Sequence, residues 1–139
     1  MVTKQQTHPD IFRADCPSRH TLQLIADEWT PLVVYALEEG TMRFSQILKR
    51  IDGISTKMLT QTLRAMERNG LVQRVVHPVV PPVVEYSLTP LGQTLVEPVN
   101  MLQTWAYEHL QEVAQARMAY DQGDHPPIQE ETAARVQQR

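Results

Sequence analysis

The pattern of apolar residues changes at Asn69-Gly70, and this change limits the folds that the chain can adopt. Residues 55–69 carry apolar side chains at helical spacing, whereas residues 71–77 and 83–88 are short runs rich in β-branched and aromatic residues. The sequence PVVPP, residues 78–82, separates these runs, and prolines cannot continue a central β ladder. We therefore expect a helix followed by an antiparallel hairpin with a stiff, extended tip.

Helical signals also precede this point. Residues 18–26 show a short amphipathic pattern, and residues 44–51 repeat apolar side chains at i, i+3, i+4 and i+7. Between them, Thr30-Pro31 predicts the start of a buried helix that ends at Gly40, because a hydroxyl caps a helix and proline fits its first position. Residues 41–44 are long enough only for an edge strand or a link.

One long helix is expected after the hairpin. Thr89-Pro90 predicts its start, and apolar residues then recur every three or four positions to about Tyr120, with a kink or a lost hydrogen bond at Pro98. The predicted fold class is therefore mainly α with a small β-hairpin, an α+β arrangement. We expect an N-terminal arm at 1–15, one domain at 16–120 and a polar tail at 121–139.

Length and composition exclude several classes of protein. The 139 residues suffice for one domain with a core, and no apolar run approaches the roughly 20 residues of a membrane span. Residues 1–13 lack the apolar stretch of a secretion signal. Cys16 is the one cysteine, which cannot form an internal disulfide and favours a reducing compartment. We expect a cytoplasmic protein without a membrane partner.

Charge is distributed unevenly along the chain. Residues 43–77 contain seven cations and two carboxylates, a formal charge of +5, so that the remainder carries −8 within a total of −3. Such a basic segment suits an anionic partner, although a solvated basic surface without a partner produces the same pattern. The seven cations are Arg43, Lys49, Arg50, Lys57, Arg64, Arg68 and Arg74.

Residues 55–69 predict a helix with one face directed to solvent. Ser55 is a suitable N-cap, and Leu59, Leu63 and Met66 form a narrow inward seam. The helix predicted over residues 44–51 and a glycine-containing turn precede it, so the two helices match a helix-turn-helix motif. In such a motif the second helix enters the major groove of DNA, and here the following hairpin supplies a wing. The outward face consists of Thr56, Lys57, Thr60, Gln61 and Arg64.

A family resemblance supports this interpretation. The sequence resembles the HxlR-type winged helix-turn-helix transcriptional regulators, relatives of the MarR group, over about residues 16–110. The matching stretches are CP at 16–17, WT at 29–30, RFSQIL at 43–48, GISTKMLTQTLRAMERNGLV at 53–72, HPVVPPVVEYSLTPLG at 77–92 and the helix containing Trp105.

The resemblance implies a bacterial or archaeal homodimeric transcription factor that binds double-stranded DNA. Glu28 and Val83 stand where the family commonly has cations, which puts contact between the wing, Val79–Val83, and DNA in doubt. The resemblance places Arg43 against the DNA backbone and Ser55, Lys57, Thr60 and Arg64 on the recognition helix. Together with Thr56, Gln61 and Arg74, these are the predicted DNA-binding residues.

The C-terminal helix predicts a dimer, because its apolar seam is longer than a small domain can cover. The first half could instead fold back on the chain's own core, and Leu22 of the first helix is expected to join the interface. A symmetric dimer predicts an inverted-repeat operator. The expected interface residues are Leu22, Leu95, Val99, Leu102, Trp105, Ala106, Leu110 and Val113.

Cys16 precedes the first helix, where a helix N-terminus stabilises a thiolate. Several members of the resembled family sense oxidants, quinones or aldehydes through a cysteine at this position, whereas a buried, inert cysteine is the other interpretation. Cys16 and His20 are spaced i, i+4, but the remaining histidines are scattered, so we predict no metal site. Trp29, Met101, Trp105 and Tyr107 could line an effector cavity, although core packing is the better explanation of each.

Two other functional classes remain open at this point. A winged helix can serve protein contacts alone, without DNA binding. A thiol enzyme could use Cys16 as nucleophile and His20 as base, but the sequence offers no oriented third group, no phosphate loop and no nucleophile elbow. We therefore predict a DNA-binding regulator without catalytic residues or a cofactor. Repression is the more usual role of such regulators, and the residues themselves do not distinguish it from activation.

Overall fold

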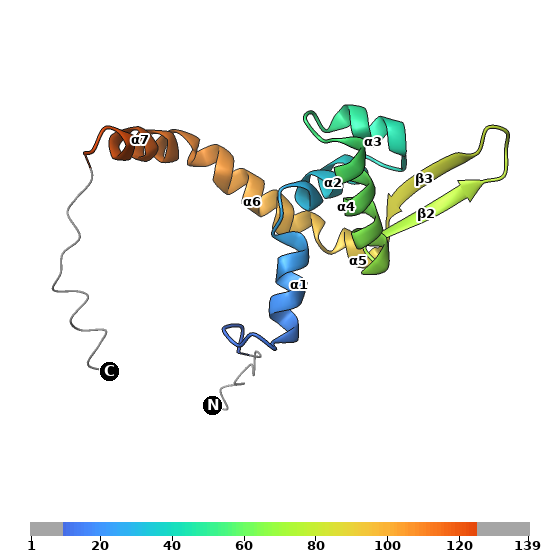
Figure 1. Ribbon diagram of the computed structural model, residues 1–139, viewed down its shortest axis with the longest axis horizontal. Helices are drawn as coiled ribbons and strands as arrows, with labels where there is room; N and C mark the ends of the chain where they lie inside the picture. The colour runs from blue at the N-terminus through green and yellow to red at the C-terminus, as the bar shows by residue number, and fades with distance from the viewer. Residues whose placement is uncertain (1–9, 125–139) are drawn as a thin grey trace. The chain divides into compact units, whose positions relative to one another are not determined.

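The computed structural model describes residues 10–124, which fall into two compact units divided between Met101 and Leu102 (Figure 1). The architecture is mainly helical with a small antiparallel sheet, as the sequence predicts. Among the described helices, none combines the length and hydropathy that a membrane span requires. The elements are α1 (Pro17–Ile25), α2 (Trp29–Glu38), β1 (Met42–Arg43), α3 (Phe44–Arg50), α4 (Thr56–Arg68), β2 (Val72–His77), β3 (Val83–Leu88), α5 (Pro90–Gln93), α6 (Val96–Glu108) and α7 (Leu110–Asp121).

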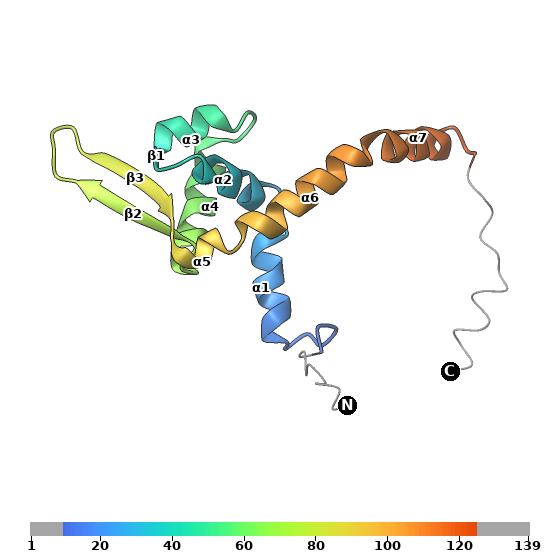
Figure 2. The same cartoon turned by 180° about the vertical axis from the view of Figure 1, so that it is seen from behind.

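The sheet has the strand order β1-β3-β2, and both pairings are antiparallel. The hairpin β2–β3 pairs Val72 with Leu88 at its base and His77 with Val83 near its tip. It extends away from α3 and α4, and α5 lies at its base (Figure 2). The two-residue β1 pairs with the other edge of β3, so residues 41–44 do contain the expected edge strand.

The core of the first unit forms where α2, α3 and α4 meet the base of the sheet. Val33 and Val34 of α2, Ile47 of α3 and Leu59 of α4 are completely buried. Leu63 and Met66 are also buried, which confirms the predicted inward seam of α4. This packing fixes the orientation of α4 and leaves its opposite face exposed.

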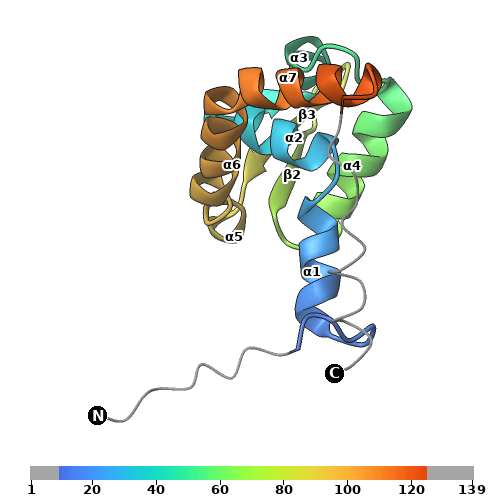
Figure 3. The ribbon, with the colours of Figure 1, turned by 90° about the vertical axis from the view of Figure 1, so that its left-hand side faces the viewer.

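Helix α1 lies outside this core. It runs away from α2 (Figure 3), and none of its residues is fully buried. Leu24 and Ile25 are partly buried at its C-terminal end, and Leu24 packs against the core.

The prediction for the start of α2 was wrong in its capping residue. Asp27 caps the helix, because its Oδ1 accepts hydrogen bonds from the backbone N–H groups of Trp29 at 2.7 Å and Thr30 at 2.8 Å. The Thr30 hydroxyl donates to Oδ2 of Asp27 at 2.6 Å and is itself buried. One carboxylate oxygen thus satisfies two free N–H groups of the first turn, and the other oxygen holds the Thr30 side chain.

The prediction of one continuous C-terminal helix was also wrong. Thr89 caps α5 by accepting a hydrogen bond from the Gly92 N–H at 3.0 Å, but α5 ends after one turn and α6 starts at Val96. Pro98 therefore lies in the first turn of α6, where its missing N–H removes no helical hydrogen bond. At His109, with φ −106° and ψ 7°, α6 gives way to α7.

The second unit is formed by the rest of α6 and by α7. Within it, the rings of Trp105 and His109 stack with centroids 4.8 Å apart. Nδ1 of His109 lies 2.9 Å from the Trp105 carbonyl oxygen, which also accepts the backbone N–H of His109 at 3.0 Å.

The expected arm and tail lie largely outside the described residues. Of the arm at 1–15, only residues 10–15 are described, and they form turns before α1. Of the tail at 121–139, residues 121–124 are described, and α7 includes the first of them.

Candidate nucleic-acid interface

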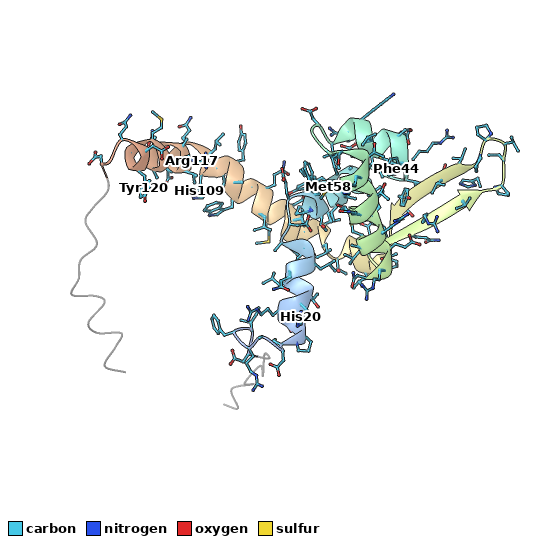
Figure 4. All side chains as sticks on the ribbon, in the orientation of Figure 1. His20, Phe44, Met58, His109, Arg117 and Tyr120 are labelled. Carbon is cyan, nitrogen blue, oxygen red and sulfur yellow. The ribbon has the colours of Figure 1, made fainter. Side chains whose placement is uncertain are left out.

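Helix α4 presents the polar face that the sequence predicts. Thr56, Lys57, Gln61 and Arg64 are exposed, and Thr60 is partly buried. Met58, labelled in Figure 4, is also exposed, at 37%. The opposite side of the helix is anchored by the buried seam and by Thr62, which is 9% exposed. A helix held in this way can enter a groove without losing its own packing.

Two hydroxyl groups of this region serve the helix itself. Oγ of Ser55 accepts a hydrogen bond from the Met58 N–H at 3.1 Å, which confirms Ser55 as the N-cap. The Thr60 hydroxyl donates to the Thr56 carbonyl at 2.8 Å. Thr60 thus has no hydroxyl hydrogen left for a phosphate in this conformation, and its methyl group is what it can offer to a thymine.

The predicted cations differ in their partners. Within residues 10–124, no side-chain hydrogen bond or ion pair engages Arg43, Lys57 or Arg64. Arg74, in contrast, pairs with Glu67 of α4, with Nε 3.4 Å from Oε2. Arg43 is exposed immediately before α3, where its backbone N–H donates to Oε1 of Gln46 at 2.8 Å. Three of the predicted DNA contacts are thus unpaired cations, and one carries its own counterion.

Arg50, another cation of the basic segment, forms an ion pair with Glu39. Arg50 of α3 donates to Glu39 at the end of α2, with Nη2 2.6 Å from Oε1. This hydrogen bond holds the pKa of Glu39 below its ordinary value. Arg50 therefore contributes less positive potential to the surface than the count of charges suggests.

A hollow of about 430 Å³ lies between α4 and the hairpin. Arg74 of β2 pairs with Tyr86 of β3. Because side chains alternate between the two faces of a strand, Val84 lies on the same face of β3 as Tyr86. Phe44 of α3, labelled in Figure 4, also lines the hollow. The full lining is Phe44, Thr60, Arg64, Glu67, Arg74, Val84 and Tyr86.

The pKa of the Tyr86 phenol depends on its burial and on the charges of this hollow. Burial raises the pKa of Tyr86, and the nearby Arg74 and Arg64 act in the opposite direction, whereas Glu67 adds to the rise. The phenol is therefore protonated at neutral pH and can donate a hydrogen bond. Neither Tyr86 nor Glu67 was among the predicted site residues, and the periodicity of each element by itself contains no signal for either.

The wing has an apolar tip. Val79 is 52% exposed and Val80 is fully exposed, and residues 78–83 carry no cation. On the face opposite Arg74, Nε2 of His77 lies 3.0 Å from Oε2 of Glu85. A wing of this composition offers van der Waals contact to DNA rather than a salt link.

Cys16 is 4% exposed and precedes α1. Arg13 donates two hydrogen bonds to Asp15, at 3.0 and 3.1 Å, which lower the pKa of that carboxyl. Arg19 donates to the Phe12 carbonyl at 3.1 Å. The two cations nearest to Cys16 in the sequence, Arg13 and Arg19, thus bond to other groups. Within residues 10–124, no three His, Cys, Asp or Glu side chains are grouped as a metal would require.

The predicted dimer residues divide into two groups. Val99 is 3% exposed and Leu95 packs on the core of the first unit, so the start of α6 does fold back on its own chain. Val99 has no surface left for a partner. The others are exposed: Leu22 at 48%, Leu102 at 66%, Trp105 at 57%, Leu110 at 62%, Val113 at 42%, and Ala106.

The aromatic residues considered for an effector cavity also divide. Trp29 packs partly against the core. Met101 and Tyr107 are exposed, at 67% and 81%. Neither of these exposed residues, nor Trp105, lines the hollow described above.

Comparison with known proteins identifies relatives along most of the chain. A family model described as HxlR-like helix-turn-helix matches residues 24–114. The uncharacterized HTH-type transcriptional regulator YtfH of Escherichia coli (strain K12) is 44% identical over 116 residues, which are 84% of this chain and 92% of YtfH.

Solved structures agree with this match. The transcriptional regulator ytfH from Salmonella typhimurium has a TM-score of 0.74 at 42% identity, covering 80% of this chain and 99% of that chain. The redox regulator HypR in its oxidized form has a TM-score of 0.62 at 38% identity, covering 67% of this chain and 96% of that chain.

Proposed function

Since this chain belongs to the HxlR-like helix-turn-helix family of DNA-binding transcriptional regulators, we propose that it acts as a homodimeric repressor with an inverted-repeat operator. The observation that carries the proposal is the exposed polar face of α4 above its buried seam. The thiol-enzyme alternative is set aside, because the family consists of regulators and not of enzymes.

Recognition of bases is assigned to α4. The guanidinium of Arg64 and the ammonium of Lys57 can donate to guanine, and the amide of Gln61 can pair with adenine. The methyl groups of Thr56 and Thr60 suit thymine. The unpaired state of Arg64 and Lys57 in the described residues supports this assignment, since no internal contact has to be broken.

The two helices α3 and α4 form the reading head of the protein. Contact with the DNA backbone is assigned to residues at its edges. Arg43 lies before α3, Arg74 lies on β2, and Ser55 stands at the N-terminus of α4, where free N–H groups attract phosphate. If each subunit neutralises about three to four phosphates, log K falls with log salt at a slope of roughly −5 to −7.

The dimer is assigned to the exposed apolar residues of α1, α6 and α7, with Val99 excluded. Leu102, Trp105, Ala106, Leu110 and Val113 recur at helical spacing and are open to solvent in the single chain. A two-fold dimer presents two copies of α4, and their half-sites would lie about 34–36 Å apart or a multiple of this distance.

Cys16 is proposed as a sensor of oxidants or electrophiles. The support is the likeness to HypR, a redox regulator, together with the position of Cys16 before α1. With one cysteine per chain, the available reactions are a disulfide between subunits, a mixed disulfide with a small thiol, or alkylation. Because Cys16 is 4% exposed, each route first requires the thiol to become accessible to the reagent.

The proposal is tested by selecting duplexes from a random-sequence pool with the purified protein, followed by footprinting. We expect an inverted repeat with both half-sites protected. Failure to enrich any sequence or to retard any duplex at low salt would favour the remaining alternative, a winged helix used for protein contacts alone.

A further inference from the structure

We propose that Glu67 is an internal competitor of the DNA backbone, which pairs with Arg74 until a phosphate replaces it and so weakens binding to every duplex. The inference rests on the DNA-binding function proposed above. It adds to the interface a residue whose charge opposes the ligand.

The geometry brings two helical charges and one strand charge to the same hollow. Arg64 and Glu67 lie one turn apart on α4, and Arg74 reaches them from β2. The Arg74 side chain is 47% exposed and that of Glu67 41% exposed, with 3.4 Å between Nε and Oε2. All three side chains line the same hollow, together with Tyr86.

The charge of the hollow decides how strongly it attracts phosphate. Arg64 and Arg74 contribute two positive charges and Glu67 one negative charge, so the lining carries +1 and not +2. Thr60 adds no free donor, because its hydroxyl hydrogen is bound to the Thr56 carbonyl. The groups that this hollow offers to an oxyanion are thus Arg64, Arg74 and the Tyr86 phenol, and Arg74 is already paired with Glu67.

The ion pair between Arg74 and Glu67 is weak enough for a phosphate to replace the carboxylate. Its distance of 3.4 Å is longer than that of a close charge-assisted hydrogen bond, and both side chains are open to water. Exposed pairs of this kind contribute little to folding. A backbone phosphate offers Arg74 the same kind of acceptor, so binding replaces the carboxylate by the phosphate while the carboxylate returns to water.

The experiment measures binding of the full-length protein to a labelled duplex of arbitrary sequence, at several salt concentrations. The variants are Glu67→Gln, Arg74→Gln and the double variant. Glu97→Gln is the control, because it makes the same change in net charge on an exposed residue of α6. Thermal melting of each variant checks that it is folded.

We expect Glu67→Gln to bind the duplex about three- to tenfold more tightly at about 0.1 M salt, with an unchanged salt slope, because Arg74 neutralises the same phosphate in both proteins. Glu97→Gln should change neither quantity. In the Arg74→Gln background the gain should largely disappear, because the competitor then has no cation to hold.

Several results would overturn the inference. Equal or weaker binding by Glu67→Gln would identify Glu67 as a structural support of Arg74 or as irrelevant to DNA. A gain that persists in full without Arg74, or that Glu97→Gln reproduces, would show an effect of net charge alone. A wild-type protein that binds no duplex would remove both this inference and the proposed function, whereas binding with an unchanged Glu67→Gln variant removes the inference alone.

Discussion

The backbones of Gly92 and Leu71 approach each other so closely that a Cβ on Gly92 would lie 2.0 Å from the Leu71 carbonyl oxygen. Gly92 belongs to α5, and Leu71 connects the end of α4 to β2. The same carbonyl oxygen accepts the backbone N–H of Thr89 at 3.0 Å, so it cannot move freely. This contact fixes the base of the wing against α5.

Gly92→Ala should therefore destabilise the protein by about 1–3 kcal/mol, the usual cost of overpacking, because backbone atoms must shift to admit the methyl group. Urea unfolding followed by circular dichroism measures the change. Gln93→Ala, at the exposed neighbouring position, is the control and should leave stability within about 0.5 kcal/mol. Equal stability of both variants would contradict the close contact.

Arg64 and Arg43 should differ in the way they affect DNA binding. Arg64→Ala is expected to cost about 1–3 kcal/mol and to relax preference at one base position, because α4 presents it to base edges. Arg43→Ala should weaken all duplexes about equally and reduce the salt slope by about one. Titration of duplexes with single base changes separates the two effects.

The control for this comparison is Arg117→Ala, which removes an exposed cation of α7, shown in Figure 4. It should leave both quantities unchanged. If Arg43→Ala changes base preference and Arg64→Ala does not, the assignment of base and phosphate contacts is reversed.

Leu110→Glu should convert the protein to a monomer. Two-fold symmetry would place a carboxylate from each subunit in the apolar interface, and burying two like charges there is costly. Light scattering after size exclusion measures the mass, and binding to an inverted repeat should fall at least about tenfold, because one half-site no longer assists the other. Gln111→Glu, one residue away on α7, is the matched control.

A Leu110→Glu variant that remains dimeric would place the interface elsewhere. A wild-type protein that is monomeric at the concentrations used for DNA binding would remove the dimer proposal itself.

Cys16→Ser should make the protein insensitive to diamide. In the wild type, two Cys16 thiols of a dimer would transfer two electrons and two protons to diamide and form a disulfide between subunits. Gel retardation with and without diamide, combined with non-reducing electrophoresis, measures release and cross-linking together. Release of the wild type and the Cys16→Ser variant to the same extent would exclude Cys16 as the sensor.

Tyr86 should contribute to the loss of stability at alkaline pH. Burial raises the pKa of Tyr86 in the folded chain, so the unfolded chain ionises first as the pH rises through about 10. The contribution is therefore complete below this pH and is lost as the pH rises toward the folded pKa. In Tyr86→Phe the alkaline decline of the unfolding free energy should be shallower, as urea titrations measure.

Tyr107→Phe is the control for this prediction, because Tyr107 is 81% exposed. An alkaline decline that is unchanged in Tyr86→Phe would show that the phenol is not shielded as the hollow implies.

The sequence alone predicted the reading head closely. The spacing of Leu59, Leu63 and Met66 set the buried side of α4, and the change of residue types at Asn69-Gly70 placed the hairpin. Both signals are local: a periodicity of 3.6 or 2 residues is visible within a few turns or strand positions. The capping residues Ser55 and Thr89 were predictable for the same reason, because a cap bonds to its own helix.

Only the tertiary structure decided which residues of different elements meet. It brought Arg74 to Glu67, placed Tyr86 in the hollow, buried Val99 in the chain's own core and divided the C-terminal helix at Thr94 and His109. The first three of these outcomes depend on packing between different elements of the fold. The spacing of residues along one element carries no information about such contacts, because burial and pairing energies arise only after the elements come together.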